Sequence, residues 1–212
     1  GSGTGRFIPM MLNAGIAHIT AIEPSEAYNV LCKNFANNPK ITFLNEPGDK
    51  IPASGNFDYV FSFGVIHHIP DPDPVMKASY AALKSGGKIG LWLYGREGNG
   101  LYLAFARTLR VFTTKLPHNA LVKIANILEV VVRAYASITK IIPLPLKSYL
   151  ENYFMKMSKE KRRLIIYDQL NPAYAKYYRG NEARDLLERA GFVDVKLYHR
   201  YGYSWTVVGT KK

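Results

Sequence analysis

Three glycines in alternate positions open the chain and constrain its fold more than any other feature. The segment Gly1–Gly5 leads into an apolar stretch, residues 6–12, whose pattern predicts a short helix ending at Gly15. A β-rich run, residues 17–22, follows and ends at Glu23. Glycine lets the backbone approach a ligand closely, and a helix start offers unpaired N–H groups. The opening stretch therefore predicts a ligand-binding loop at the edge of a sheet.

The position of Glu23 indicates what such a loop would bind. An acidic residue at the tip of the next strand, about 20 residues beyond a glycine-rich loop, can hold both hydroxyls of a ribose. The glycine spacing here is G-x-G-x-G, whereas dinucleotide enzymes have G-x-G-x-x-G. The loop therefore does not favour a nicotinamide cofactor. Taken alone, an ordinary glycine-rich turn before a helix is the alternative.

Strands and helices alternate through most of the chain, which is typical of an α/β fold. The predicted strands after Glu23 are residues 40–44, 57–62, 88–94, 192–198 and 203–208. Too few residues join the last two strands for a parallel crossover, so they must pair antiparallel. The pattern predicts a doubly wound, mostly parallel sheet.

With these later segments added, the chain resembles class I S-adenosylmethionine (SAM) dependent methyltransferases, in the subgroup of quinone- and small-molecule-type enzymes. The resemblance covers residues 1–95 and resumes at residues 167–212. It implies a Rossmann-like sheet with an antiparallel last strand, and SAM as the cofactor. It also implies a central strand before Gly1, so we interpret the sequence as an N-terminally truncated piece of a longer protein.

The resemblance implies which residues contact the cofactor. The glycine loop faces the methionine part of SAM, Glu23 takes the ribose, and the loop after the third strand holds the adenine. Counting back from the pair Ile51-Pro52 puts Pro47 where the family has an adenine-binding Asp, so Glu46, or Asp49 if the loop is shifted, takes that role. The segment after the fourth strand flanks the cofactor. The implied cofactor-binding residues are Gly1, Ser2, Gly3, Gly5, Glu23, Pro24, Glu46, Pro47, Phe63, Gly64 and Val65.

Methyl transfer from a sulfonium needs alignment, exclusion of water and an acceptor for any proton that leaves. No fixed catalytic residue is expected. His67 and His68 are the candidates for a general base, and the alternative is that they only shape their loop. Tyr167, Asp168 and Tyr174 are the candidate substrate contacts. No cluster of His, Cys and carboxylate residues has metal-ligand spacing, so no metal is expected.

Residues 99–166 interrupt the alternation and predict a helical lid insertion in a domain formed by residues 1–98 and 167–212. Polar residues recur every three or four positions from 119 to 140, which places them on one face of a helix with a wide apolar side. They are Asn119, Lys123, Asn126, Glu129, Arg133, Ser137 and Lys140.

Charge is concentrated in the same region. Residues 101–165 contain twelve Lys or Arg and three Asp or Glu, which gives +9 of the chain's net +12. A basic, apolar-faced insertion predicts a lid over the active site. The alternative is contact with an anionic membrane surface or a lipid-like substrate.

The sequence thus predicts SAM-dependent methyl transfer to a small apolar or aromatic acceptor, with a lipid- or quinone-like molecule as one option. The alternatives are a nucleic-acid methyltransferase and a non-catalytic SAM-binding protein. A nucleic-acid partner is not expected, because the segment from Ser62 to His68 lacks the Asn/Asp-Pro-Pro-aromatic signature of base-amine methylation and no recognition module is evident. Without a secretory signal or an apolar run of bilayer length, we expect a cytoplasmic protein, with membrane association as the alternative.

Overall fold

The chain divides into two compact units. A computed structural model describes residues 1–171 and 174–212. The sheet unit comprises Gly1–Gly95, Lys176–Arg200 and Ser204–Lys212, and the helical unit comprises Arg96–Ala175 and Tyr201–Tyr203. The helical unit is longer than the predicted insertion of residues 99–166, because its last helix continues to Leu170.

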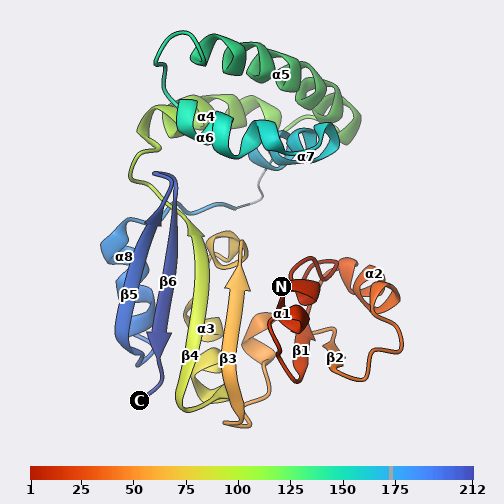
Figure 1. Ribbon diagram of the computed structural model, residues 1–212, viewed down its shortest axis with the longest axis vertical. Helices are drawn as coiled ribbons and strands as arrows, with labels where there is room; N and C mark the ends of the chain where they lie inside the picture. Colours follow the sequence, from red (N-terminus) through yellow and green to blue (C-terminus); the bar gives the residue numbers. More distant parts are fainter. Residues whose placement is uncertain (172–173) are drawn as a thin grey trace. The chain divides into compact units, whose positions relative to one another are not determined.

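The described strands of the sheet unit form two sheets (Figure 1). In the smaller sheet, β1 (Ile19–Ile22) and β2 (Ile41–Leu44) pair in parallel. The larger sheet has the order β3-β4-β6-β5, with β3 and β4 parallel and β6 antiparallel to both of its neighbours. Its strands are β3 (Phe57–Phe63), β4 (Leu83–Tyr94), β5 (Val193–Arg200) and β6 (Ser204–Thr210). The predicted α/β fold with an antiparallel C-terminal strand is confirmed.

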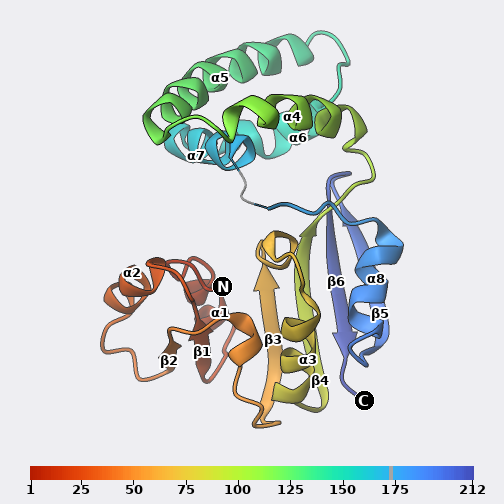
Figure 2. The same cartoon turned by 180° about the vertical axis from the view of Figure 1, so that it is seen from behind.

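Helices of the sheet unit connect these strands. They are α1 (Ile8–Asn13), α2 (Ala27–Asn34), α3 (Asp73–Ala82) and α8 (Gly180–Glu188), with 3-10 turns η1 (Gly48–Lys50) and η2 (Ile66–His68). Figure 2 shows α3 and α8 on the same face of the larger sheet. The first turn of α8 is closed by Glu182, whose carboxylate accepts the backbone N–H of Arg179 at 2.7 Å.

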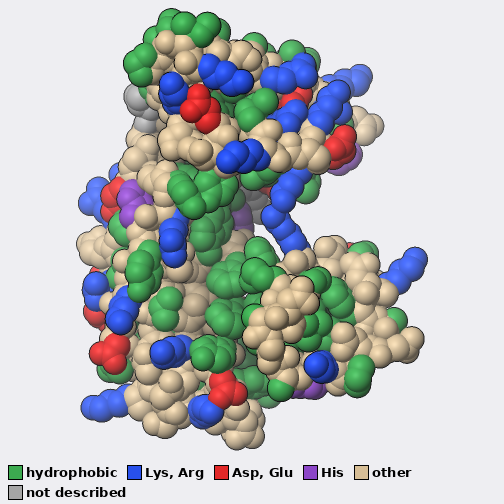
Figure 3. All heavy atoms as spheres, viewed as in Figure 1, with side chains coloured by type: hydrophobic (Ala, Val, Ile, Leu, Met, Phe, Trp, Pro, Cys, Tyr) green, Lys and Arg blue, Asp and Glu red, His purple; other side chains and the backbone are tan. Residues whose placement is uncertain are grey.

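The main core lies between the larger sheet and these two helices, with the leucines of β4 packed against Leu186 and Leu187. A separate small core joins α1 and α2 to the β1–β2 sheet around Leu31. On β3, Tyr59, Phe61 and Phe63 form an aromatic row on the face opposite the main core. Figure 3 shows hydrophobic side chains over β3 and β4. Aliphatic side chains thus build the packed face of this sheet, and aromatic ones dominate its other face along β3.

The helical unit is held together by its longest helix. Its elements are α4 (Gly100–Thr113), α5 (His118–Thr139), α6 (Lys147–Asn152), the turn η3 (Phe154–Lys156) and α7 (Lys159–Leu170). One cluster of buried residues contains Leu121 and Leu170, where α5 meets α7, and another contains Ala136 and Leu150, where α5 meets α6. These two clusters cover only one side of α5.

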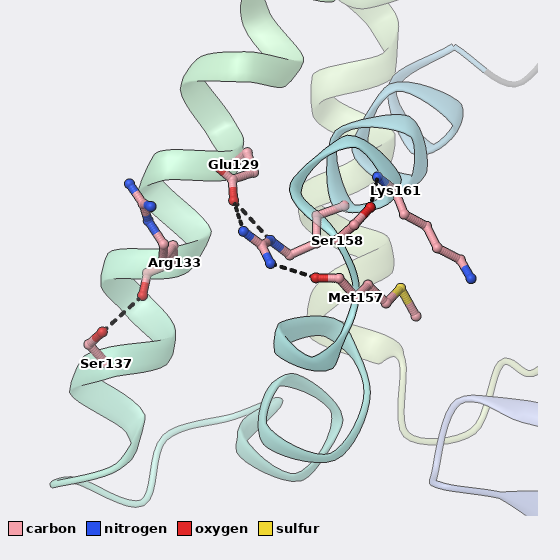
Figure 4. A network of polar contacts seen from close by, with 7 residues as sticks. Glu129, Arg133, Ser137, Met157, Ser158 and Lys161 are labelled. Atoms are coloured by element: carbon pink, nitrogen blue, oxygen red, sulfur yellow. Dashed lines mark hydrogen bonds and ion pairs between the residues drawn. The ribbon is translucent and has the colours of Figure 1, made fainter.

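Glu129, which the helical spacing places on the polar face of α5, is fully buried. Its Oε1 accepts hydrogen bonds from Nε of Arg162 at 2.8 Å and from Nη2 at 2.6 Å, and Nη1 of Arg162 donates to the Met157 carbonyl at 2.7 Å (Figure 4). A carboxylate paired in this way can be buried. α5 therefore packs with part of its polar stripe inward, which leaves part of its apolar side exposed.

Candidate functional site

The glycine loop and Glu23 meet at the carboxyl end of β1, as the sequence predicts for a ligand-binding edge. The backbone N–H of Gly3 donates to Oε2 of Glu23 at 2.6 Å, although the two residues lie 20 positions apart. The N–H of Ser2 donates to the Ile22 carbonyl at 2.8 Å, which continues the contact along the strand. The loop is therefore fixed against the end of β1 by its own backbone.

The Glu23 side chain is buried and held by a second partner on its other oxygen. Oε1 accepts the Ser25 hydroxyl at 2.6 Å and the Ser25 N–H at 3.1 Å. Burial acts to raise the pKa of Glu23, but the hydrogen bonds from Ser25 and Gly3 outweigh burial, and the pKa lies below its ordinary value. Glu23 is consequently ionised at neutral pH.

Two glycines of the loop are required for different reasons. Gly5 has φ of +88°, and a Cβ there would lie 2.2 Å from the Phe35 ring, so both conformation and packing exclude a side chain. Gly3 has φ of +54°, and a Cβ there would meet nothing within 4 Å. The open side of Gly3 leaves room for a ligand beside Glu23.

The segment after β3 lies against the same loop. A Cβ on Gly1 would lie 2.8 and 2.9 Å from the two methyl groups of Val65, and the rings of Phe7 and Phe63 pack edge to face with centroids 5.3 Å apart. Gly64, which lies between Phe63 and Val65, has φ of +79° and allows the chain to turn there. Two of the predicted cofactor-binding segments are thus brought together.

The predicted adenine residues lie at the next loop of the same edge. Glu46 and Pro47 are exposed directly after β2, and in the described part of the chain no hydrogen bond joins them to the Glu23 carboxylate. Asn45 provides the connection instead, because its side-chain amide donates to the Glu23 carbonyl at 2.8 Å. Pro24 is exposed beside Glu23. The adenine role of Glu46, Pro47 or Asp49 stays a prediction.

His67 is fully buried in a cluster of aromatic rings at the carboxyl end of β4. Its ring stacks on Tyr94 with centroids 3.8 Å apart, beside His68 and Trp92. The Tyr94 N–H lies 3.4 Å from Nδ1 of His67, so the neutral ring carries its proton on Nε2, which has no partner among the described residues. Burial first, and then the neighbouring His68, lower the pKa of His67 to about 3.

These contacts separate the two candidate bases. The described neutral form of His67 has no lone pair free for a proton, and its low pKa makes it a weak base. His68 is exposed and next to it. The main chain also stabilises this turn, because the Lys176 N–H donates to the His67 carbonyl at 2.8 Å. His68 is therefore the better placed of the two for proton transfer.

The predicted substrate residues all belong to the helical unit, whereas the cofactor residues belong to the sheet unit. Tyr167 packs in the cluster between α5 and α7, and its hydroxyl lies 2.9 Å from Nδ1 of His118. Asp168 and Tyr174 are exposed. Their roles as substrate contacts stay predictions.

Sequence reasoning did not single out Asn45, or the aromatic pair Trp92 and Tyr94, as site residues. The two rings follow each other at alternate positions near the end of β4, and Tyr94 also stacks on Tyr177 with centroids 5.2 Å apart. Their place at the carboxyl end of a buried strand was a usable signal, since ligands of open α/β sheets bind at that edge.

The fit of a nucleoside to this edge can be judged from Glu23. A carboxylate has about four lone-pair sites, and three hydrogen bonds already fill three of them. One ribose hydroxyl can therefore bond to Oε2 directly, and a second requires the Ser25 hydroxyl to rotate away. With the open side of Gly3, the residues present fit a ribose. SAM, when bound, supplies an electrophilic methyl group on a sulfonium.

Residues 1–91 match the family model described as "Methyltransferase domain". This segment carries the glycine loop, Glu23 and the turn after β3. The match shows that this part of the chain is similar to a methyltransferase domain, and SAM is the cofactor that this similarity implies.

Relatives found by sequence comparison are methyltransferases of several kinds. Phosphoethanolamine N-methyltransferase 2 of Caenorhabditis elegans is 49% identical over 41 residues, which cover 19% of this chain and 9% of that protein. Arsenite methyltransferase of Mus musculus is 29% identical over 104 residues, covering 42% and 28%. The tRNA U34 carboxymethyltransferase of Shewanella halifaxensis is 33% identical over 97 residues, covering 43% and 29%. The chain thus spans less than a third of these relatives.

Solved structures share the fold. The human N-acetylserotonin methyltransferase in complex with SAM has a TM-score of 0.57 at 14% identity, covering all of this chain and 46% of its own. A SAM-dependent methyltransferase of Thermotoga maritima has a TM-score of 0.52 at 18% identity, covering all of this chain and 79% of its own. At these identities the comparison supports the methyltransferase-like fold alone.

Proposed function

We propose that this chain is the SAM-binding part of an enzyme that methylates a small apolar or aromatic acceptor, with a lipid- or quinone-like molecule as one option. The observation that carries the proposal is the 2.6 Å hydrogen bond from the Gly3 N–H to the Glu23 carboxylate, which joins the glycine loop to an ionised acid at the ligand-binding edge. A peripheral membrane contact of the helical unit is part of the proposal.

The chemistry asked of the protein is mainly alignment. Glu23 and the glycine loop would hold SAM, whose sulfonium would supply the methyl group to an acceptor atom while the sulfur keeps the electron pair of the broken bond. The acceptor's proton, where it has one, leaves to a base, and His68 is the candidate at this edge. The protein's own contribution is to orient the ribose through Glu23 and to exclude water.

The aromatic rings beside this edge support an aromatic or apolar acceptor. His68, Trp92 and Tyr94 surround the buried His67 ring, and Tyr177 stacks on Tyr94. Flat apolar surfaces of this kind bind aromatic molecules by stacking. A charged, strongly hydrated acceptor would gain little from these rings.

The test is a calorimetric titration of the chain with SAM. We expect Glu23→Ala to weaken SAM binding by more than about tenfold, because hydrogen bonds to a charged group contribute about 1.5–3 kcal/mol. Glu26→Ala is the matched control, since Glu26 is an exposed carboxylate three positions further on, and it should leave affinity unchanged. Equal affinity of the Glu23→Ala and unaltered chains would reject the ribose assignment.

Two other functions remain as alternatives. A nucleic-acid methyltransferase is favoured by the net charge of +12, and RNA binding that weakens steeply with salt would promote it. A non-catalytic SAM-binding protein would bind SAM in the same titration yet transfer no methyl group to any acceptor panel in the full-length protein.

A further inference from the structure

The outer side of α5 is apolar and exposed. Four exposed side chains, Ile127, Val130, Val131 and Ile138, lie on α5, and Ile141 lies in the turn directly after it. They are 64%, 49%, 55%, 47% and 85% exposed, in sequence order. At 3.6 residues per turn they fall within an arc of about 100°. The buried side chains of the helix, such as Leu121 and Ala136, lie on the opposite side. We call the five exposed residues the outer face of α5.

The outer face continues past the end of the helix. The backbone N–H groups of Ile141 and Ile142 both donate to the Ile138 carbonyl at 3.0 Å, so the helical turn carries the row of side chains forward. Ile142 is 51% exposed and Leu146, after two prolines, is 43% exposed. Figure 3 shows hydrophobic side chains over this part of the helical unit. Contiguous apolar surface of this kind marks a binding surface.

The exposed charges along the sequence of the outer face have one sign. Residues 98–150 contain seven Lys or Arg and one acidic residue, Glu129. Glu129 is fully buried and bonded to Arg162, so it contributes no negative charge to the surface. Lys123 and Arg133 are exposed on α5, and Lys140 is exposed at its C-cap. An exposed apolar face whose charged neighbours along α5 are cations is complementary to an anionic lipid surface.

Other partners match this surface less well. Single-stranded nucleic acid is bound by cations together with aromatic rings that stack on bases, and the outer face is aliphatic. A second copy of the chain would bring two strongly basic segments together, which costs electrostatic energy. Within the described residues no helix is both long and apolar enough to cross a bilayer.

We propose that the outer face of α5 docks the chain on the surface of a bilayer that contains anionic lipids. The helix lies in the interface with Ile138 and Ile141 inserted among the acyl chains, while Lys123, Arg133 and Lys140 extend toward lipid phosphates. This inference deepens the peripheral membrane contact included in the proposed function, and it does not depend on the proposed methyl transfer, because it concerns the helical unit only.

The experiment is co-sedimentation of the 212-residue chain with vesicles of phosphatidylcholine alone, or with about one-third phosphatidylglycerol. We expect binding to the anionic vesicles that is at least about tenfold tighter than to the neutral ones and that weakens with salt. Ile138→Gln with Ile141→Gln, and separately Lys123→Gln with Arg133→Gln and Lys140→Gln, should each lower this binding about tenfold or more.

Matched controls come from exposed residues of the sheet unit. Val30→Gln controls for the loss of exposed apolar surface, and Lys33→Gln with Lys40→Gln and Lys77→Gln controls for the loss of three positive charges. Circular dichroism checks that each variant keeps its helices. The substituted lysines and arginine are exposed, so the charge variant is expected to fold and tests the proposal even if the apolar variant unfolds.

The proposal is overturned if the folded chain does not bind anionic vesicles, or if the controls weaken binding as much as the α5 variants do. It is also overturned if the apolar variant abolishes self-association or RNA binding while vesicle binding stays the same. A SAM titration of the same variants keeps the two proposals distinct, since loss of vesicle binding with unchanged SAM affinity concerns the docking surface alone.

Discussion

Glu23 and His67 both have lowered pKa values, but acid affects them in different ranges of pH. Glu23 is held ionised by hydrogen bonds, so its contribution to stability is present above its ordinary value of 4.5 and is lost as pH falls through the lower folded value. His67 is kept neutral by burial, while the unfolded chain takes up a proton below about 6.5. As the pH falls, stability is therefore lost first through His67, and only at lower pH through protonation of Glu23.

We predict that His67→Phe reduces the loss of stability in mild acid. Between about pH 7.5 and about pH 5 the unaltered chain should lose about 2 kcal/mol through proton uptake by the unfolded histidine, because each unit of pKa difference corresponds to about 1.4 kcal/mol. The phenylalanine variant keeps a ring stacked on Tyr94 and cannot take up a proton. Urea unfolding at the two pH values measures the difference.

The groups around His67 provide the control. His68 lies beside it, and Lys176 bonds to its carbonyl through the backbone. His68→Phe removes an exposed imidazole and should leave the acid sensitivity in place. If His67→Phe and the unaltered chain lose the same free energy of unfolding between the two pH values, the assignment of a low pKa to His67 is wrong.

Among the elements, α5 shows most clearly what helical spacing can and cannot predict. The spacing correctly separates a polar stripe from a wide apolar side. The buried side of the helix, however, includes part of the polar stripe, with Glu129 inside. The partner that permits this burial, Arg162, lies 33 residues away on α7. A local pattern does not contain such a contact. The same packing leaves the outer face of α5 exposed.

We expect Glu129→Ala to destabilise the helical unit by about 3 kcal/mol or more, because it leaves the Arg162 guanidinium buried without its ionic partner. Glu151→Ala is the comparison, since the pair of Glu151 with Lys147 is partly exposed and spans 4.0 Å. Pairs of that kind contribute less than about 1 kcal/mol. Thermal unfolding followed by far-UV circular dichroism measures both.

Replacing both members of the buried pair separates charge from packing. Glu129→Leu together with Arg162→Met removes both charges and keeps apolar volume, so it should recover much of the stability lost in Glu129→Ala. If the double variant is as unstable as the single one, the lost contacts of the side chains, rather than an unpaired charge, account for the effect.

The candidate site was predictable where it depends on local sequence. The glycine loop, Glu23 and the turn after β3 occur in short motifs whose backbone requirements can be recognised directly. Asn45 and the aromatic cluster around His67 depend on which strand ends lie side by side, and that arrangement is set by the register of the sheet. The exposure of Asp168 and the packing of Tyr167 likewise follow from tertiary contacts on α7.

At the scale of the whole molecule, each unit has hydrophobic clusters of its own. We predict that differential scanning calorimetry resolves two transitions, and that SAM raises only the transition of the sheet unit. At a SAM concentration about 100 times its dissociation constant, that unit gains about 2.7 kcal/mol. A single transition that shifts as a whole would show that the two units unfold together.

The burial of Glu129 against Arg162 also determines how the charge of the outer face responds to pH and ionic strength. With the one carboxylate between residues 98 and 150 closed off from solvent, that span exposes no acidic side chain whose protonation would change the charge of the surface. Acidification would therefore not release the chain from an anionic interface. Ionic strength, or phosphorylation of hydroxyl groups such as that of Ser137, would be the means of detaching it.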